Sequence, residues 1–581
     1  VAVKIPNPPH GPIETFKAGD DKAKNIVWRA EMPGWANSTP IVVGDRVITL
    51  ADPCQTVCVD AQTGKILWTA AANPWEVAGV EKGLADRLMQ LHQIYLDGEP
   101  YWEAMSGRST MTRIMPETEI RPIVDIYKKS VQPRLIAELK KLDPSGPWDK
   151  TAAEVLTGLE AYLTSLAKAD PNGKPADGDR SARDKRHNLR KAIDQRIEDL
   201  GNKTPLLLDR PWNNTLGWCM ASPVSDGERI YSYFGHNFVV CHDLNGKRMW
   251  GYFVGQRKRD GANCFQIVSP VLRGTVLVVT VSTTMLHGLD ARTGKKLWER
   301  NFKGPSGYSI GTHLAVRVGL TGKEVDALVT HSGMIVRMSD GAEIGDLQYP
   351  EKCAHGGQSV FGGNGIVVKG ACGDGFNAPL IGYRLAGTAD AVTAEKVWEL
   401  PKTSRYEPTA TNGTVFFYPD AFYDLASGTK VPGNLDRNGS DVRIWAGNRF
   451  IFACNGSLGW GGRSPQVDNA AVQTFKVLDV TDPAKPRMAA ATNLLSTKDR
   501  PRIPAMETLA KELYDLPNYC GQSFGWPAHL FYTETGMVPA GNRLFLRSVG
   551  HLYCIGDPAA PYDWNPASRP KAIADQIKAV K

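Results

Sequence analysis

Histidine and tryptophan residues recur beside glycines and turn-forming residues in this chain of 581 residues. Imidazole nitrogens can donate or accept hydrogen bonds, and indole rings can stack on a flat cofactor or a sugar. These residue types therefore predict a ligand-binding face, although they do not identify the ligand. The alternative is that the histidines are solvated turn residues and the tryptophans pack against their neighbours, as such residues more often do. The candidates for this face are Trp35, Trp218, His236, His313, His331, His355, Gln358, Arg405, Trp526, His529 and His551.

One loop is rich in oxygen ligands. Asp374 and Asn377 place a carboxylate and an amide within four residues, which suits a hard cation such as calcium. Aspartate and asparagine are also frequent turn formers, so the same loop fits an ordinary turn. Both residues are therefore metal candidates with an alternative that the sequence leaves open.

The ten cysteines fall into two groups. Cys58, Cys241 and Cys554 take equivalent positions on apolar strands, where a small side chain suits a packed core. Other cysteines lie near predicted loops, where disulfide bonds would form if their Cα atoms approach closely enough. The candidate pairs are Cys353 with Cys372 and Cys454 with Cys520.

A repeated phrase fixes the architecture that must position these residues. Residues 60–68 read Asp-Ala-Gln-Thr-Gly-Lys-Ile-Leu-Trp, and residues 243–250 and 290–298 follow the same pattern. Each copy describes a strand that ends at aspartate, a turn with a left-handed glycine, and a strand that begins with lysine and ends on tryptophan. An alternating apolar run after Ser-Pro or Thr-Pro precedes each copy. Four antiparallel strands repeated every 40–50 residues or so indicate a propeller blade.

Eight such units follow one another along the chain. The last unit ends at residues 554–557 without a tryptophan strand, and Ile26–Arg29 can supply the missing outer strand. We therefore predict an all-β fold with a helical insertion: an eight-bladed propeller of four-stranded antiparallel blades, closed by the N-terminal strand, which removes an exposed edge. The inner strands are predicted to start near Ser38, Ala221, Ile267, Leu314, Ser359, Thr409, Val442 and Met537.

The Asp-Ala-x-Thr-Gly-Lys-x-x-Trp phrase resembles the tryptophan-docking repeat of β-propellers of the pyrroloquinoline quinone (PQQ) type, over residues 26–72 and 208–557. That family includes quinoprotein alcohol dehydrogenases and the propeller lipoprotein of bacterial outer-membrane assembly. Resemblance to the dehydrogenases would imply PQQ and calcium, together with adjacent paired cysteines and a Trp-Asp-Tyr-Asp phrase, neither of which occurs here. Pro211-Trp212-Asn213 is similar to the phrase that supplies their calcium-binding asparagine, so Asn213 is a third metal candidate.

Two insertions interrupt the β pattern. Residues 76–207 predict helices at 84–95, 123–142, 152–167 and 182–200, with Thr151 and Glu154 as a capping box. Residues 491–530 predict a shorter helix from Ile503 to Tyr514. Both insertions join the outer strand of one blade to the inner strand of the next, so we expect them to cover or rim the channel mouth; peripheral decoration or an oligomer contact is the alternative. The predicted divisions are blade 1 with the closing strand at 26–75, the helical insertion at 76–207, blades 2–8 at 208–557 and a C-terminal tail at 558–581.

Composition narrows the location of the protein and the class of its partner. The net charge is +7, no block of five basic residues occurs, and no run of 18 apolar residues occurs, so nucleic-acid binding and a transmembrane helix gain no support. The first residue, Val1, is compatible with removal of a signal peptide, and the resembling bacterial proteins are exported. We expect a periplasmic or secreted location.

Function is less defined than fold, because sites are grafted onto folds. The leading prediction is a scaffold that binds a protein, glycan or small molecule through the face rimmed by the insertions. The alternative is a quinoprotein alcohol or sugar dehydrogenase dependent on PQQ and calcium, or another enzyme with its site beneath the helical insertion. The residues themselves assign no cofactor.

Overall fold

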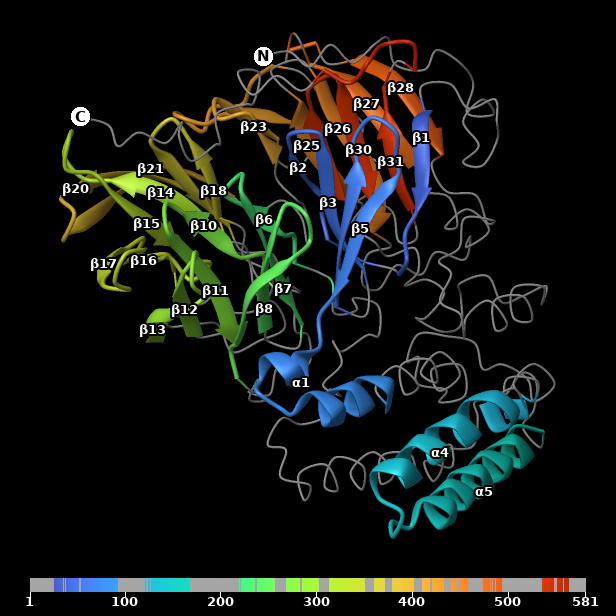
Figure 1. Cartoon of the computed structure of the whole chain (residues 1–581). Helices are drawn as coiled ribbons and strands as arrows, with labels where there is room; N and C mark the ends of the chain where they lie inside the picture. The colour runs from blue at the N-terminus through green and yellow to red at the C-terminus, as the bar shows by residue number, and fades with distance from the viewer. Residues whose placement is uncertain are drawn as a thin grey trace.

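Antiparallel sheets make up most of this computed structural model (Figure 1). It describes residues 26–91, 121, 124–167, 219–255, 268–301, 313–350, 360–370, 379–401, 410–432, 440–446, 450–457, 474–493, 536–547 and 551–563. Within these ranges the positions not described are 35, 37, 52–53, 126, 220, 236–237, 283–284, 418–420, 481, 483, 486 and 557. Within these residues, seven sheets have four strands and one has three. The predicted propeller architecture of four-stranded antiparallel blades is confirmed; the count of eight blades and a fully closed ring stay predictions.

We number the sheets in the chain order of their inner strands. The first four sheets are built from consecutive strands. Sheet 1 contains β2 (Ile41–Val43), β3 (Arg46–Ala51), β4 (Gln55–Asp60) and β5 (Ile66–Ala71); sheet 2 contains β6 (Val224–Ser225), β7 (Arg229–Phe234), β8 (Phe238–Asp243) and β9 (Arg248–Phe253); sheet 3 contains β10 (Val271–Arg273), β11 (Val276–Ser282), β12 (Met285–Asp290) and β13 (Lys296–Asn301); sheet 4 contains β14 (Leu314–Val318), β15 (Val325–Val329), β16 (Met334–Arg337) and β17 (Glu343–Asp346).

The remaining sheets include the two that depart from this plan. Sheet 5 contains β18 (Val360–Gly363), β19 (Ile366–Lys369), β20 (Leu380–Gly387) and β21 (Val392–Leu400); sheet 6 contains β22 (Ala410–Thr411), β23 (Val415–Phe417) and β24 (Phe422–Asp424); sheet 7 contains β25 (Ser440–Ala446), β26 (Phe450–Ser457), β27 (Thr474–Asp479) and β28 (Arg487–Asn493); sheet 8 contains β29 (Gly536–Ala540), β30 (Arg543–Arg547), β31 (His551–Ile555) and β1 (Ile26–Glu31). In sheet 6 the described residues form three strands, and where the fourth is expected they add one bridge between Tyr423 and Lys430.

The core lies between the faces of neighbouring sheets. The second and third strands of sheet 1 are buried along most of their length, whereas outer strand β5 alternates between exposed and half-buried residues. This difference arises because the middle strands have a sheet packed on each face, while the outer strand borders solvent. One cluster of buried side chains joins Val47 and Val57 of sheet 1 to Phe545 and Leu552 of sheet 8.

A repeated tryptophan contact, which we call the tryptophan clasp, joins several sheets at their outer rim. The indole Nε1 donates to a carbonyl of the next sheet, and the ring covers a glycine with positive φ in the turn there. A Cβ added to Gly246, for example, would lie 2.7 Å from the Trp68 ring. The donor–acceptor pairs are Trp28 with Ala61 (3.0 Å), Trp68 with Leu244 (3.0 Å), Trp250 with Ala291 (3.1 Å), Trp298 with Met338 (2.8 Å) and Trp398 with Leu425 (2.9 Å).

The N-terminal strand completes sheet 8 as predicted. β1 pairs antiparallel with β31, with Ile26 opposite Ile555 and Glu31 opposite His551. A described part of the C-terminal tail adds a second link, since the Tyr562 hydroxyl donates to the carbonyl of Gly44 in sheet 1 (3.2 Å). Segments from both chain ends therefore bind the first and last sheets to each other.

The described helices lie between β5 and β6 in the chain (Figure 1). They are α1 (Pro74–Val77), a helical stretch at 82–91, the π-helical turn η2 (Tyr127–Val131), α4 (Gln132–Leu142) and α5 (Trp148–Ala167). The predicted capping box is wrong: α5 begins at Trp148, and Thr151 lies inside it with its hydroxyl donating to the carbonyl of Pro147 (2.9 Å). The helices expected at 182–200 and at 503–514 lie outside the described residues.

Candidate functional site

The turns between the second and third strands lie at the same end of the sheets as the segments that enter the inner strands. We call this end the turn face. Four residues from three consecutive sheets meet there: Thr280 near the end of β11, His313 before β14, His331 in the turn after β15, and Lys369 at the end of β19. With Tyr349, they form what we call the His313 cluster.

The two histidines hold each other through ring and backbone. Their rings stack with centroids 5.2 Å apart and planes 26° apart. The backbone N–H of His331 donates to Nδ1 of His313 (3.1 Å), and Nε2 of His313 lies 2.9 Å from the hydroxyl of Thr280. His313 therefore bonds to sheet 3 on one side and to its own sheet on the other.

Lys369 brings a buried cation to the same cluster. Its side chain is fully buried, and Nζ donates to the carbonyl of His331 (2.6 Å). The same Nζ lies 4.3 Å from the centre of the Tyr349 ring, a distance at which a cation gains from the negative face of the ring. Sheet 5 is thereby tied to the turn of sheet 4.

The electrostatics of this cluster favour neutral imidazoles. Removal of the ring from water lowers the pKa of His313 to about 4. Burial, followed by the positive fields of His313 and Lys369, lowers the pKa of His331 well below its usual value. Both rings are therefore uncharged at neutral pH.

Each further joint at the turn face uses different polar groups. Thr56 and Ser232 share a hydrogen bond between their hydroxyls (2.8 Å), and the Tyr233 hydroxyl donates to the carbonyl of Thr280 (2.6 Å). Between sheets 8 and 1, the buried guanidinium of Arg547 donates to the carbonyls of Gly34 (2.8 Å) and Leu50 (3.4 Å). The described polar groups of this face thus connect one sheet to the next.

Three residues of the ligand face predicted from the sequence, His313, His331 and His551, lie among the described residues. His313 and His331 are brought together, whereas His551 begins β31 in sheet 8, where its ring lies 6.1 Å from that of Tyr553. Lys369 and Arg547 were not predicted, because in sequence a buried basic residue at the end of an apolar strand does not differ from a solvated one. The candidates outside the described residues are Trp35, Trp218, His236, His355, Gln358, Arg405, Trp526 and His529, with the metal candidates Asn213, Asp374 and Asn377.

The cysteine predictions divide in the same way. Cys58, Cys241 and Cys554 are fully buried free thiols on their strands, as predicted. Burial raises the pKa of each to about 12, despite the opposing field of a nearby arginine. The disulfide candidates Cys353, Cys372 and Cys520, and the side chain of Cys454, lie outside what the structure describes.

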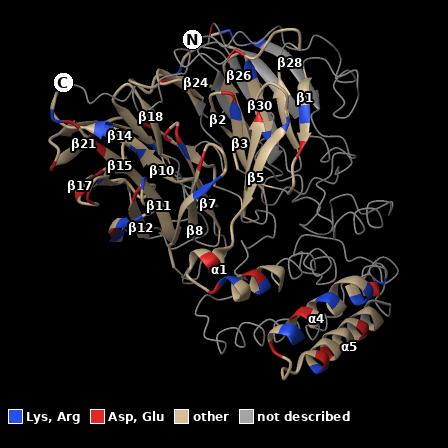
Figure 2. Ribbon diagram, in the orientation of Figure 1, with Lys and Arg blue, Asp and Glu red and all other residues tan. Residues whose placement is uncertain are grey.

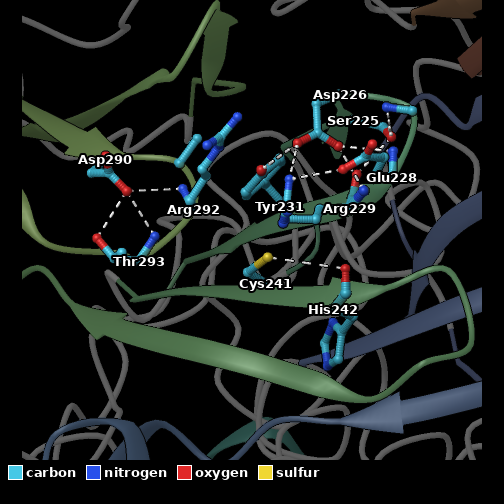
Figure 3. Close-up of polar contacts among 12 residues, drawn as sticks. Ser225, Asp226, Glu228, Arg229, Tyr231, Cys241, His242, Asp290, Arg292 and Thr293 are labelled. Atoms are coloured by element: carbon cyan, nitrogen blue, oxygen red, sulfur yellow. Dashed lines mark hydrogen bonds and ion pairs between the residues drawn. The ribbon is translucent and has the colours of Figure 1, made fainter.

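Aspartates shape turns at the opposite end of the sheets: Asp290 belongs to the repeated phrase, and Asp226 lies in the turn between β6 and β7 (Figure 3). Asp290 accepts from the backbone N–H of Arg292 (3.0 Å) and from both the N–H and the hydroxyl of Thr293 (2.8 Å each). Asp226 accepts from Arg229 and from the Tyr231 hydroxyl (2.9 Å). Burial raises the pKa of Asp226, but its hydrogen bonds outweigh burial and leave the pKa below its usual value. These carboxylates are engaged in holding the strand connections.

The beginning of the helical insertion is fixed to sheet 2. Helix α1 starts with Asn73 as its N-cap, whose side chain accepts from the N–H of Trp75 (3.0 Å), and Trp75 is buried. Glu76 forms an ion pair with Arg248 on β9, and the Val77 side chain lies over Gly251, so closely that an added Cβ would be 3.1 Å away. The insertion therefore leaves the propeller from an anchored point on an outer strand.

Helices α4 and α5 pack on each other further along the insertion. Gln132 Nε2 donates to the carbonyl of Ala152 (2.9 Å), and Lys140 pairs with Asp149 (2.6 Å). Apolar residues such as Leu135 and Leu159 are buried, whereas the outward positions carry charges of both signs (Figure 2). The pair thus has buried apolar residues and a charged surface.

Comparisons with known proteins agree with the repeat. Residues 15–105 and 211–343, less than half of the chain, match the family described as outer membrane protein assembly factor BamB. The chain is a β-propeller protein with PQQ-type repeats. A human protein, FAM234B, is 26% identical over 156 residues, which span 27% of this chain and 21% of that protein.

Solved structures give distant matches. BamB from Moraxella catarrhalis is 11% identical, with 58% of this chain and 86% of that chain covered and a TM-score of 0.34. The computationally designed Ika8 protein is 11% identical, with 58% and 83% covered and a TM-score of 0.35.

The described residues contain neither a membrane-spanning helix nor a metal-binding cluster. None of the described helices combines the length and apolarity needed to span a membrane. Three or more histidine, cysteine, aspartate or glutamate side chains in a metal-binding arrangement do not occur in the part of the chain that the structure describes.

Proposed function

We propose that this propeller is a protein-interaction scaffold that acts outside the cytoplasm and holds its partner through the helical insertion at 76–207. The family description as an outer-membrane protein assembly factor supports a role in bringing proteins together. The observation that carries the proposal is the anchoring of α1 on β9 by Glu76, Val77 and the buried Trp75.

The propeller supplies a rigid base for such an insertion. Tryptophan clasps join sheets at the outer rim, and hydrogen bonds through Thr56, Tyr233, His313 and Arg547 join them at the turn face. Groups that are bonded within the protein have little capacity left for a ligand. This favours a role in which the described part of the turn face supports the insertion.

The surface of the helical insertion suits a protein partner. In α4 and α5 the apolar side chains Leu135, Val155 and Leu159 are already buried, and Arg134, Ala137 and other outward residues are exposed. A mixed-charge surface on such a helix pair gives a partner orientation and specificity through complementary charges.

Site-specific photo-crosslinking tests this proposal in cells that express the protein. A photoreactive residue at position 134, 137 or 153, all exposed on α4 or α5, should yield a defined crosslinked partner. The matched controls are Leu67 and Leu297, which are 45% and 47% exposed on outer strands β5 and β13. Crosslinks from the controls alone, or an unchanged partner set after deletion of residues 76–207, would contradict the proposal.

The alternative enzymatic function has a direct spectroscopic test. Purified protein mixed with PQQ and Ca²⁺ should show no stoichiometric uptake of the quinone chromophore and no dye-linked oxidation of alcohols or sugars if the scaffold function holds. Stoichiometric uptake with oxidation of an alcohol would replace the scaffold proposal by a quinoprotein dehydrogenase.

A further inference from the structure

His313 stands where three sheets meet, and its hydrogen bonds define its protonation state. Nδ1 accepts the backbone N–H of His331 (3.1 Å), so Nδ1 carries no proton. Nε2 then carries the proton of the neutral ring and donates to the Thr280 hydroxyl (2.9 Å). A second proton can be added to this ring only at Nδ1, and its addition removes the acceptor that holds His331.

The surroundings make a second proton unfavourable. Among the residues that the structure describes, the neighbours that titrate or carry charge include the stacked ring of His331, 5.2 Å away, the ammonium of Lys369 on the His331 carbonyl, and the phenol of Tyr349 beside that ammonium. The charged forms of His331 and Lys369 are both positive. A proton on either histidine therefore meets repulsion from this cluster and loses the solvation that water would give it.

The backbone of His331 is the element that responds. Its N–H donates to His313, which is itself hydrogen-bonded to Thr280 of sheet 3, and its carbonyl accepts from Lys369 of sheet 5. One residue of the turn between β15 and β16 is thus held from both sides. When His313 gains a proton, the first bond is lost and a positive charge appears close to the second.

We propose that the His313 cluster is an acid-sensitive latch: neutral His313 holds the β15–β16 turn closed against sheets 3 and 5, and protonation releases that turn while the rest of the propeller stays folded. The clasp of Trp298 on Met338 contains no titrating group, so it continues to hold sheets 3 and 4 at the outer rim. Sheets 4 and 5 remain joined by an apolar cluster that includes Val329 and Val367, which does not titrate either. The release is local and exposes the turn face of sheets 3 to 5.

The direction of the pH effect follows from linkage. The unfolded or opened histidine has a pKa near 6.5, while that of folded His313 is lowered to about 4. The opened state therefore binds more protons between these values, so closure is fully favoured above about pH 6.5 and weakens as the pH falls toward 4.

Hydrogen–deuterium exchange of the full-length protein tests the latch. Peptides that contain His331 should be protected at pH 7. Near pH 4 their protection factor, corrected for the intrinsic exchange rate, should be at least tenfold lower. In His313→Asn, the amide oxygen can replace Nδ1 as acceptor without titrating, so the protection should persist at both pH values. His242→Asn is the matched control, because burial also lowers the pKa of His242 to about 4 but its ring packs on Trp68 in another joint.

Three outcomes would overturn the latch. Protection that is equal at pH 7 and pH 4 in the unaltered protein excludes it, as does a pH response that survives in His313→Asn. Loss of protection across all sheets at once would indicate global acid unfolding. If His313→Asn does not fold, nitrogen NMR of the unaltered protein decides: an Nε2–H tautomer that persists below pH 5.5 supports the latch, and an ordinary titration near pH 6.5 rejects it.

Discussion

The outer rim and the turn face join the same sheets by different means. At the rim, five joints use the same tryptophan clasp, with one indole, one carbonyl and one left-handed glycine. At the turn face, the joints differ: a hydroxyl pair between sheets 1 and 2, a histidine between sheets 3 and 4, an arginine between sheets 8 and 1.

The clasps have the same chemistry at each of their joints, whereas the polar contacts of the turn face differ from joint to joint. The clasp buries an aromatic ring and makes a neutral hydrogen bond, and neither changes with pH in the physiological range. The turn face places cations and imidazoles out of water, where each depends on its own partners. Five joints of the rim therefore share one kind of contact, whereas each joint of the turn face has properties of its own.

The largest expected effect comes from removing a clasp. Trp298 is 8% exposed, so Trp298→Ala leaves a cavity over Gly341 and should lower the free energy of unfolding by about 3–5 kcal/mol, as measured by urea denaturation. Trp298→Phe keeps most of the ring and loses the bond to Met338, so it should cost clearly less. Equal effects of both substitutions would show that the ring is not the main contribution.

The buried arginine should rank next. Arg547→Met retains an apolar stem but leaves the carbonyls of Gly34 and Leu50 without this donor, and we expect a loss of about 2–4 kcal/mol in the same measurement. Arg229→Met is the control, because Arg229 is more exposed and its ion pair with Asp226 lies in a turn. A larger loss for Arg229→Met would reverse the ranking of buried and exposed cations.

Glycine substitutions separate backbone strain from ring contact within the clasp. Gly246 has φ +86° and would place a Cβ 2.7 Å from Trp68, whereas Gly227 has φ +96° and open space around it. Gly227→Ala should cost about 1 kcal/mol for the left-handed backbone alone. Gly246→Ala should cost about 1–2 kcal/mol more, and equal thermal shifts for the two variants would mean that the ring moves aside freely.

The sequence predicts the rim well because the rim repeats. The left-handed glycine at position 246 and the strand that ends on Trp68 were predicted because the same spacing recurs, whereas the contact between them came only from the structure. The strand closing sheet 8 was predictable for the same reason, because the last unit lacked an outer strand and Ile26–Arg29 was left over.

The turn face could not be predicted to the same depth. His313 and His331 were identified as candidates, but their stacking depends on how three sheets approach, which no local pattern encodes. Lys369 follows three apolar residues and is buried, yet the same letters would describe a strand that ends in solvent. The start of α5 was missed because Thr151 resembled an N-cap, whereas the buried Trp148 extends the helix toward its N-terminus.

The joint between sheets 4 and 5 provides the smallest effect and the sharpest test of the comparison. Gly345 stands on β17 where the repeat would place a tryptophan, and the backbone of Val392 packs against it. The rim contact there is an ion pair between Arg337 and Asp390, whose carboxylate side is 81% exposed. Exposed pairs contribute about 0–1 kcal/mol, so Asp390→Ala should change the free energy of unfolding by no more than that, far less than loss of a clasp.

High salt should leave the Trp298→Ala effect intact and erase the small Asp390→Ala effect, because screening acts on exposed charges and not on buried rings. If Asp390→Ala proved as costly as Trp298→Ala, the contrast between an apolar clasp and an exposed ion pair at the outer rim would fail at this joint.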